Sequence, residues 1–360
     1  MKFLRDQVVA RLQTEMQLPD LSGTRYRAIG FLGQGGMGSV WLAEDSILHR
    51  AVALKVLAAE NSSADLAARL MQEALILARL EHPGIVPVHD AGALPDGRTF
   101  YCMKHVEGQT LDRHLDRLPL RQRLQLLQRV AEPLAFAHSR GVIHRDLKPG
   151  NIMVGAFGEV LIMDWGLAKV MATGVSLPAE QVSGHVMSAT GLSSPAGQVS
   201  GHEFTRAVSV PLESGALAPE NAPATNTAHG AVLGTPGFMA PEQERGEASS
   251  IDQRTDVFAL GAILKYALQD RPGAPRSESA SRALRAVCGK AMAAEMSARY
   301  SSVQELAADI GKYLDDMPVS AYRENIFERL VRLVNRNRVA VVLVLAYLLM
   351  RMLFILFSRH

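Results

Sequence analysis

A glycine-rich stretch near the start of the chain has the composition of a phosphate-binding loop. Its sequence, Gly33-Gln34-Gly35-Gly36-Met37-Gly38-Ser39-Val40, fits the pattern G-x-G-x-x-G-x-V. Glycines let the backbone approach phosphate oxygens and direct N–H groups at them, which larger side chains at those positions would block. The pattern alone is a weak signal, because the same spacing opens dinucleotide-binding folds.

The residues that follow the loop separate these two possibilities. A dinucleotide-binding loop runs into a helix, whereas the sequence Val40-Trp41-Leu42-Ala43 predicts a strand, so the loop is expected to be a flap over a nucleotide. A further strand is predicted over 51–56, and its Lys55 either snorkels out of the sheet or faces the α- and β-phosphates. Glu73 is the natural partner of Lys55, because apolar residues at 66, 70, 74, 77 and 80 predict a helix around it.

The most specific motif of the chain is the run His144-Arg145-Asp146-Leu147-Lys148-Pro149-Gly150-Asn151. It resembles the catalytic loop of Hanks-type protein kinases, most closely the bacterial serine/threonine members, and the resemblance covers about residues 26–316. It implies transfer of the γ-phosphate of ATP to serine or threonine hydroxyls of protein substrates, with the chain itself among them. A polar turn with this spacing by chance is the alternative.

The resemblance assigns a role to each polar residue of this loop. Phosphoryl transfer has a loose transition state, so the protein mostly positions groups and neutralises charge. Asp146 is expected to orient the attacking hydroxyl and accept its proton, and Lys148 to hold the charge of the transferring phosphate. Asn151 and Asp164 are expected to supply oxygen ligands to Mg²⁺ or Mn²⁺. Trp165, where phenylalanine is commoner in the family, is expected to pack under the regulatory helix.

The same resemblance places the nucleotide between two groups of residues. The adenine is expected under a gatekeeper methionine, Met103, although a methionine at a strand end is also an ordinary core residue. The hinge backbone runs from Lys104 to Val106. The complete set of expected nucleotide-binding residues is Gly33, Gln34, Gly35, Gly36, Met37, Gly38, Val40, Ala53, Lys55, Met103, Lys104, Val106 and Met153.

Residues after the catalytic loop are assigned supporting roles. The run Gly234-Thr235-Pro236-Gly237-Phe238-Met239-Ala240-Pro241-Glu242 matches the substrate-facing loop of the family and its Ala-Pro-Glu marker. The resemblance implies that Glu242 pairs with Arg299, for which a surface ion pair is the alternative. Asp256 is expected to hold the backbone of the catalytic loop from a buried helix, and Thr235 to support that loop by hydrogen bonding.

Regulation by phosphorylation is a further hypothesis. Arg145 is expected to bind a phosphate on the activation segment through charge-assisted hydrogen bonds. Thr225 and Thr227 resemble the paired threonines that bacterial relatives autophosphorylate, and threonines without a role are the alternative. Self-association would raise the rate of such autophosphorylation in trans.

These motifs require a two-lobed α+β fold. The kinase domain is expected over 26–316, with a small antiparallel sheet and one regulatory helix in an N-lobe at 26–106 and a mainly helical C-lobe at 107–316. Residues 1–25 predict a short amphipathic segment. Residues 172–230 are rich in Ser, Ala, Gly, Pro and Thr, which predicts a disordered insert in the activation segment.

The C-terminal part predicts a membrane anchor. A basic juxtamembrane segment at 317–338 precedes the stretch 339–357, in which Arg351 is the one charged residue. Nineteen helical residues span about 28 Å, close to a bilayer core of about 30 Å. We therefore expect a transmembrane helix and a single-pass protein of the cell membrane with its kinase domain on the cytoplasmic side. A buried C-terminal helix is the alternative.

The composition excludes some classes of partner and leaves two competing functions. The formal net charge of +2 gives no basic field for nucleic acid, and Cys102 and Cys288 suit a reducing cytosol. A pseudokinase scaffold that binds without chemistry is one competitor. Such scaffolds usually lose one of the residues that stand here as Lys55, Asp146 and Asp164. An adaptor anchored in the membrane, whose kinase fold is incidental, is the other competitor.

Overall fold

The computed structural model describes most of the chain up to residue 170 and most of it after residue 236. The described residues are 18–35, 38–58, 63–116, 118–170, 237–247, 249–269, 281–325, 329 and 338–357. The predictions for Gly36, Met37, Thr225, Thr227, Thr235 and the insert 172–230 lie outside these residues. The same holds for most of the N-terminal segment and much of the basic segment.

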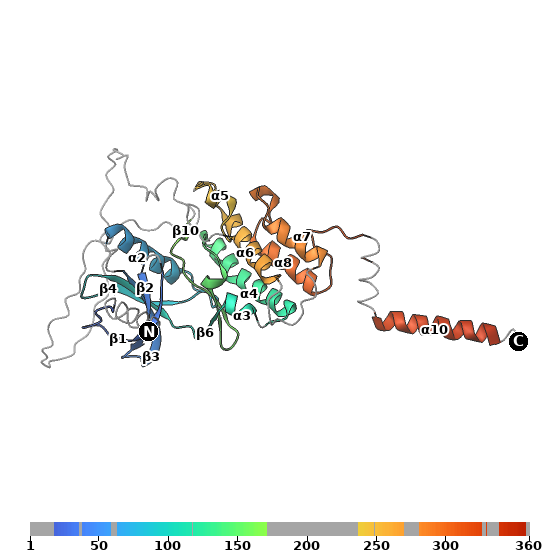
Figure 1. Ribbon diagram of the computed structural model, residues 1–360, viewed down its shortest axis with the longest axis horizontal. Helices are drawn as coiled ribbons and strands as arrows, with labels where there is room; N and C mark the ends of the chain where they lie inside the picture. Colours follow the sequence, from blue (N-terminus) through green and yellow to red (C-terminus); the bar gives the residue numbers. More distant parts are fainter. Residues whose placement is uncertain are drawn as a thin grey trace, which may run out of the picture. The chain divides into compact units, whose positions relative to one another are not determined.

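A five-stranded antiparallel sheet forms the first part of the fold (Figure 1). Its strands lie in the order β1-β2-β3-β5-β4, with the bounds Tyr26–Gln34, Gly38–Asp45, Arg50–Leu57, Thr99–Lys104 and Val88–Ala93. The glycine-rich stretch connects β1 to β2, as a strand–loop–strand requires. A Cβ atom on Gly38 would lie 2.1 Å from the carbonyl oxygen of Val56, so only glycine fits where β2 starts beside β3.

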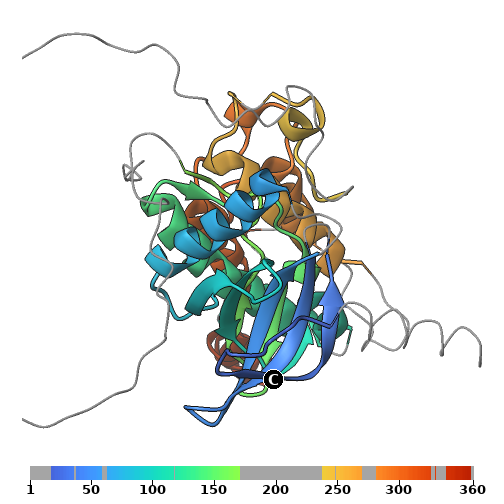
Figure 2. The same cartoon turned by 90° about the vertical axis from the view of Figure 1, so that its left-hand side faces the viewer.

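One helix covers one face of this sheet. Helix α2 (Ala64–Arg79) begins at Ser63, whose hydroxyl accepts the N–H of Leu66, and packs on β3, β4 and β5. Figure 2 shows the helix beside the strands. Residues of β5 alternate between the two faces, since Tyr101 belongs to the core shared with α2 whereas Phe100 and Cys102 belong to a second core on the opposite face.

The second part of the fold is mainly helical. Its larger helices are α4 (Leu120–Ser139), α6 (Gln253–Ala267), α7 (Arg282–Ala291) and α8 (Val303–Leu314), which pack on one another (Figure 1). Helix α6 is buried along most of its length, so the other helices surround it. Shorter helices are α3 (Leu111–Leu115), α5 (Pro241–Glu244) and the 3₁₀ turns η2 (Pro149–Asn151) and η3 (Met296–Ala298).

Short strands carry the segments between the sheet and the large helices. Strands β6 (Gly108–Thr110), β8 (Ile152–Gly155) and β9 (Val160–Ile162) form a three-stranded sheet in the order β6-β8-β9. Strand β7 (Val142–Ile143) pairs with β10 (Lys169–Val170). The catalytic-loop motif therefore lies between β7 and β8, and Asp164 follows β9. The predicted small antiparallel sheet with one helix, followed by a mainly helical part, is confirmed.

The C-terminal expectation requires a correction. A helix, α10, does form at Arg338–Phe357. Among the residues that the structure describes, however, no helix is both long enough and apolar enough to cross a membrane. Arg351 divides the apolar residues of 339–357 into runs of twelve and six, and a bilayer core needs about 20. The prediction of a transmembrane helix is therefore wrong. The predictions of a lipid bilayer as partner and of a membrane localisation were based on that helix, and the structure gives them no support.

Candidate active site

Lys55 lies at the centre of the candidate site and contacts two carboxylates. Its Nζ donates to both carboxylate oxygens of Glu73 at 2.8 Å and to Oδ1 of Asp164 at 2.9 Å. These contacts join strand β3, helix α2 and the segment after β9. Burial would lower the pKa of Lys55, but the charges of Glu73 and Asp164 outweigh it and raise this pKa. Lys55 therefore stays a cation and faces the interior rather than the solvent.

Asp164 is held in a conformation that exposes its carboxylate. Its φ is +57°, a left-handed value that is uncommon for a residue other than glycine, and its side chain is 48% exposed. Burial opposes its charge, yet the neighbouring Lys55 lowers the pKa of Asp164 below the ordinary value. The adjacent Trp165 is fully buried, and its ring lies 4.6 Å from that of His144. Trp165 thus packs in the core and fixes the position of Asp164.

The three polar residues of the catalytic-loop motif lie close together. Lys148 Nζ donates to Asp146 Oδ2 at 2.9 Å. Asn151 Nδ2 donates to the main-chain oxygen of Asp146 at 2.8 Å and to its Oδ2 at 3.3 Å. These bonds hold the Asp146 carboxylate between a cation and an amide.

A buried carboxylate on α6 holds the main chain of this loop. Asp256 accepts the N–H of His144 at 2.9 Å and the N–H of Arg145 at 2.9 Å. His138, at the end of α4, is a third partner at 2.7 Å. Burial would raise the pKa of Asp256, but the hydrogen bond from His138 and the nearby N–H groups lower it. The loop needs this support because Arg145 has a φ of +70°.

The segment before α6 is fastened by a buried ion pair. Arg299 donates to both carboxylate oxygens of Glu242 at 2.8 Å, and both side chains are almost completely buried. Thr255 adds a hydrogen bond to Glu242 at 2.9 Å. The alternative of a surface ion pair is therefore excluded for these two residues. The neighbouring Gln243 donates its Nε2 to the main-chain oxygen of Arg145 at 2.6 Å, which ties α5 to the catalytic loop.

The expected nucleotide-binding residues lie along adjacent strands. Val40 on β2 is the cross-strand neighbour of Lys55, and Ala53 on β3 is that of Met103 on β5. Lys104 donates its main-chain N–H to the oxygen of Pro87 at 3.0 Å. Elsewhere in the set, Gly33 and Gln34 end β1, Gly35 follows it, Gly38 starts β2, Val106 is buried after β5 and Met153 lies on β8.

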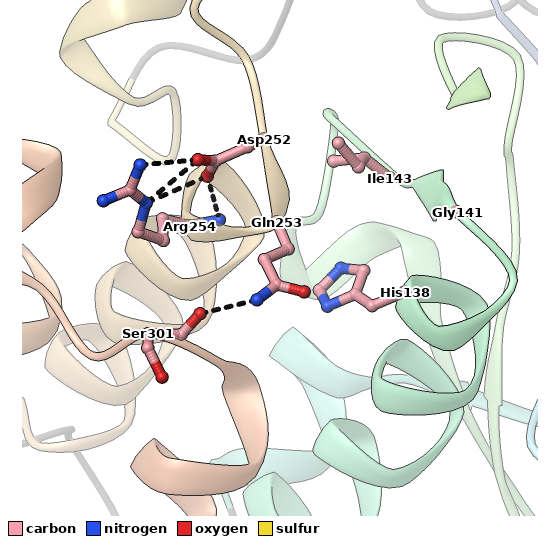
Figure 3. A pocket seen from close by; sticks show the side chains of 7 residues that line it. All are labelled: His138, Gly141, Ile143, Asp252, Gln253, Arg254 and Ser301. Carbon is pink, nitrogen blue, oxygen red and sulfur yellow. Dashed lines mark hydrogen bonds and ion pairs between the residues drawn. The ribbon is translucent and has the colours of Figure 1, made fainter. Parts of the chain in front are cut away.

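A cavity of about 440 Å³ lies apart from these residues, beside the end of α4 and the start of α6 (Figure 3). Its lining residues are His138, Gly141, Ile143, Asp252, Gln253, Arg254 and Ser301. Gln253 donates to the main-chain oxygen of Ser301 at 2.7 Å, and Arg254 binds Asp252 (Figure 3). No predicted nucleotide-binding residue lines this cavity.

Two oxygen-bearing side chains suit a hard divalent cation. Asn151 uses its amide nitrogen on Asp146, so its side-chain oxygen is available as a ligand. Asp164 contributes a half-exposed, ionised carboxylate. Neutral and charged oxygens are the ligands that Mg²⁺ prefers. The donor set therefore fits the metal that the sequence motifs imply.

Three residues of this arrangement were not predicted from the sequence. Tyr101, on β5, donates its hydroxyl to Glu73 at 2.9 Å. Gln243 and His138 bind the catalytic loop and its anchor Asp256, as described above. Tyr101 could have been found by strand alternation, which places it on the same face as Met103, two residues later. No periodic signal identifies Gln243 or His138.

Similarity to known proteins agrees with this geometry. Residues 26–193 match the protein kinase domain. The serine/threonine-protein kinase PknD of Chlamydia felis is 33% identical over 332 residues, which cover 82% of this chain and 31% of that protein. PknD of Protochlamydia amoebophila is 29% identical and covers 81% of this chain and 30% of its own length. The chain thus spans about a third of the length of these curated relatives.

A solved structure shows the same fold. The PknI kinase domain of Mycobacterium tuberculosis has a TM-score of 0.51 and 23% sequence identity. The superposition covers 82% of this chain and 98% of that one.

Proposed function

Since this chain belongs to the protein kinase family, we propose that it transfers the γ-phosphate of ATP to serine or threonine hydroxyls of proteins. The observation that carries the proposal is the arrangement around Lys55. One lysine on β3 binds a carboxylate of α2 and the carboxylate that follows β9. Phosphoryl transfer requires β3, α2 and the segment after β9 to be in place together, and the single ammonium group of Lys55 contacts the carboxylates of the other two.

Each residue of the catalytic loop has a separate task in this proposal. Asp146 orients the attacking hydroxyl and accepts its proton. Lys148, bound to Asp146 at 2.9 Å, lies where it can neutralise charge on the phosphate in transfer. Lys55 orients the α- and β-phosphates, and Glu73 holds Lys55 in place. Positioning and charge neutralisation are the contributions that this reaction requires from a protein.

The metal ligands in this proposal are Asn151 and Asp164. Mg²⁺ or Mn²⁺ held by these two residues would supply positive charge that neutralises the phosphates of ATP. Asn151 is oriented for this role because its amide nitrogen is fixed by Asp146. Asp164 is held ionised by Lys55, so it keeps the negative charge that a cation attracts.

The nucleotide is proposed to lie against the strands β1, β2, β3 and β5. The glycines of the β1–β2 connection face its phosphates, and the adenine lies beside Val40, Ala53 and Met153 with the main chain of 104–106 as its hydrogen-bonding edge. The cross-strand pairs Val40–Lys55 and Ala53–Met103 support this placement, because they put the adenine residues and the phosphate lysine in adjacent rows. We also propose that the kinase domain extends over 26–316.

Activation by phosphorylation is part of the proposal. The side chain of Arg145 is partly buried, and its Nε has no hydrogen-bond partner among the described residues. Burial lowers the pKa of Arg145, so an anion beside it would be favourable. A phosphate on the segment between Asp164 and Glu242 would supply that anion. Thr225 and Thr227 are the proposed acceptors, modified in trans by a second copy of the chain.

The test compares the full chain with Asp146→Asn under identical Mg²⁺ and radiolabelled ATP. Loss of the positioned base should lower the rate of phosphate transfer by about 10²–10⁴-fold. Asp20→Asn is the matched control, because it makes the same chemical change at an exposed position and should transfer phosphate at the parent rate. Label must appear on serine or threonine in the parent.

The same experiment separates an enzyme from a scaffold. Thermal stabilisation by ATP and Mg²⁺ measures nucleotide binding without chemistry. Binding by the parent and both variants, with no label in any of them, would contradict the proposed reaction and favour a nucleotide-binding scaffold.

A further inference from the structure

Tyr101 carries a deeply buried hydroxyl at the edge of the candidate site. The residue is 1% exposed, and its hydroxyl donates to Oε1 of Glu73 at 2.9 Å. A buried tyrosine hydroxyl requires a hydrogen-bond partner, since leaving it unpaired costs the solvation it has lost. The partner here is the same carboxylate that holds Lys55.

The sheet register brings Tyr101 to this position. Tyr101 on β5 is the cross-strand neighbour of Lys55 on β3, so both side chains point to the face covered by α2. Lys55 Nζ also lies 5.7 Å from the centre of the Tyr101 ring, within the range of a cation–π contact. Tyr101 therefore contacts both members of the Lys55–Glu73 pair.

The hydroxyl changes how firmly Glu73 is held. Lys55 has a flexible side chain that ends in a point charge. By itself it restrains the distance between its ammonium group and the Glu73 carboxylate better than it restrains the orientation of that carboxylate. Tyr101 has a rigid ring and donates from a second strand. Among the described residues, Lys55 and Tyr101 are the two side chains that donate to Glu73, and they do so from β3 and β5. Together they fasten α2 to two strands instead of one.

We propose that Tyr101 is a positioning residue for phosphoryl transfer, which holds Glu73 and through it the ammonium of Lys55. This inference rests on the proposed kinase activity. Its action is indirect, because the hydroxyl is bonded to Glu73 and Glu73 is bonded to Lys55. A phenylalanine would fill the same space and leave the carboxylate with Lys55 as its one side-chain donor.

Tyr101→Phe in the full chain is the first test. The turnover number kcat should fall about three- to tenfold, the effect of one ordinary hydrogen bond, because Glu73 keeps Lys55 as its charged partner. The KM for ATP should change less than about twofold, because the contact orients Lys55 for the transition state. Equal kcat values in the parent and the variant would overturn the proposal.

A double-mutant cycle separates positioning from packing. If Tyr101 acts through Glu73, then Tyr101→Phe should have little further effect on kcat in a Glu73→Ala background, which has no acceptor for the hydroxyl. If the two residues contributed independently, the fold-reductions in kcat of the single variants would multiply in the double variant. That result would show that Tyr101 does not act through Glu73.

The chain supplies a matched control in Tyr300. Its hydroxyl is also buried and donates to a carboxylate, Oδ2 of Asp309, at 2.9 Å, but it lies near η3 and α8. Tyr300→Phe makes the same chemical change and should lower the melting temperature without lowering kcat. A fall in kcat as large as that of Tyr101→Phe would mean that a general loss of stability explains both.

Hydrogen exchange gives a readout that needs no catalysis. The amides of α2 should exchange about three- to tenfold faster in Tyr101→Phe than in the parent, and no faster in the double variant than in Glu73→Ala. If the parent chain transferred no phosphate, the proposed function would be refuted. Hydrogen exchange in α2 would still test whether Tyr101 holds Glu73. Unchanged exchange in α2 would overturn this inference while leaving the kinase proposal intact.

Discussion

Asp256 accepts the main-chain N–H of Arg145 at 2.9 Å, so a buried carboxylate on α6 fixes the residue that precedes Asp146. The second oxygen of Asp256 accepts the N–H of His144 and contacts His138. The conformation of the catalytic loop thus depends on an acceptor that is neither in the loop nor near it in sequence.

Replacing Asp256 by asparagine should destabilise the protein and slow phosphate transfer. One side-chain oxygen becomes an N–H₂ group that faces other donors, so a buried hydrogen bond is lost and a donor is left unpaired. We expect the free energy of unfolding to fall by about 2–4 kcal/mol, measured by urea denaturation. Asp252→Asn is the control, because asparagine caps the start of α6 as well as aspartate does. Equal stability of the two variants would contradict the role of Asp256.

The buried pair of Glu242 and Arg299 should be far more sensitive to mutation than an exposed pair. Arg299→Met leaves the Glu242 carboxylate buried without its cation and should cost about 3–5 kcal/mol in unfolding free energy. Arg245→Met breaks the exposed pair of Arg245 with Glu247 and should cost less than about 1 kcal/mol. Chemical denaturation of both variants measures the difference, and similar costs would refute it.

The stability of the chain should fall in acid partly because of Asp309. Burial raises the pKa of Asp309, but hydrogen bonds from Ser320, Lys312 and Tyr300 outweigh it and lower the pKa to about 2. A lowered folded-state pKa contributes stability above the unfolded value of about 4, and this contribution disappears as the pH falls toward 2. It amounts to about 2 kcal/mol.

The role of Asp309 can be tested by measuring the free energy of unfolding between pH 5 and pH 2. This range covers the ordinary pKa of an aspartate and the lowered pKa of Asp309 in the folded protein. Asp309→Asn should be less stable at neutral pH and should lose that part of the pH dependence. A parallel decrease in both proteins over this range would assign the effect to other carboxylates.

The two tryptophans of the chain should respond differently to replacement by phenylalanine. Both are almost fully buried, but Trp41 donates its indole N–H to Ser39 at 2.8 Å, whereas the indole N–H of Trp165 has no acceptor among the described residues. Trp41→Phe therefore loses a hydrogen bond and Trp165→Phe removes an unpaired donor. We expect Trp41→Phe to cost at least about 1 kcal/mol more in unfolding free energy. Thermal and urea unfolding of the two variants decide this, and equal costs would contradict it.

The sequence predicted well the parts of the fold that depend on local periodicity and on motif spacing. Short apolar stretches predicted the two strands that follow the glycine-rich stretch, and apolar spacing predicted a helix that carries Glu73 toward Lys55. The sequence left two positions possible for the Lys55 side chain, toward solvent or toward the phosphates, because a single charged residue in a strand can snorkel outward. Contacts with Glu73 and Asp164 decided between them, and such contacts arise only when the sheet and the segment after β9 come together.

The remaining site residues depend on tertiary contacts that leave little trace in the sequence. Tyr101 stands in a run of strand-forming residues, where a core tyrosine is the ordinary expectation. Gln243 acts through a side-chain bond to the main chain of Arg145, and its partner is 98 residues away. The C-terminal prediction was wrong for a different reason, because it weighed the total apolar content of 339–357 above the break at Arg351.

The contacts of Lys55 have a consequence for nucleotide affinity. An ammonium group has three N–H donors, and the acceptors described for Lys55 are three carboxylate oxygens, two on Glu73 and one on Asp164. A phosphate oxygen can bind Lys55 only by replacing one of them, and the half-exposed Asp164 is the one that a ligand can reach. In the proposed function, nucleotide binding at Lys55 is thus an exchange of one charged hydrogen bond for another. The free energy of this binding is therefore a difference between two similar hydrogen-bond energies. A ligand that moves Asp164 away from Lys55 will tighten nucleotide binding. Nucleotide will tighten the binding of that ligand by the same factor.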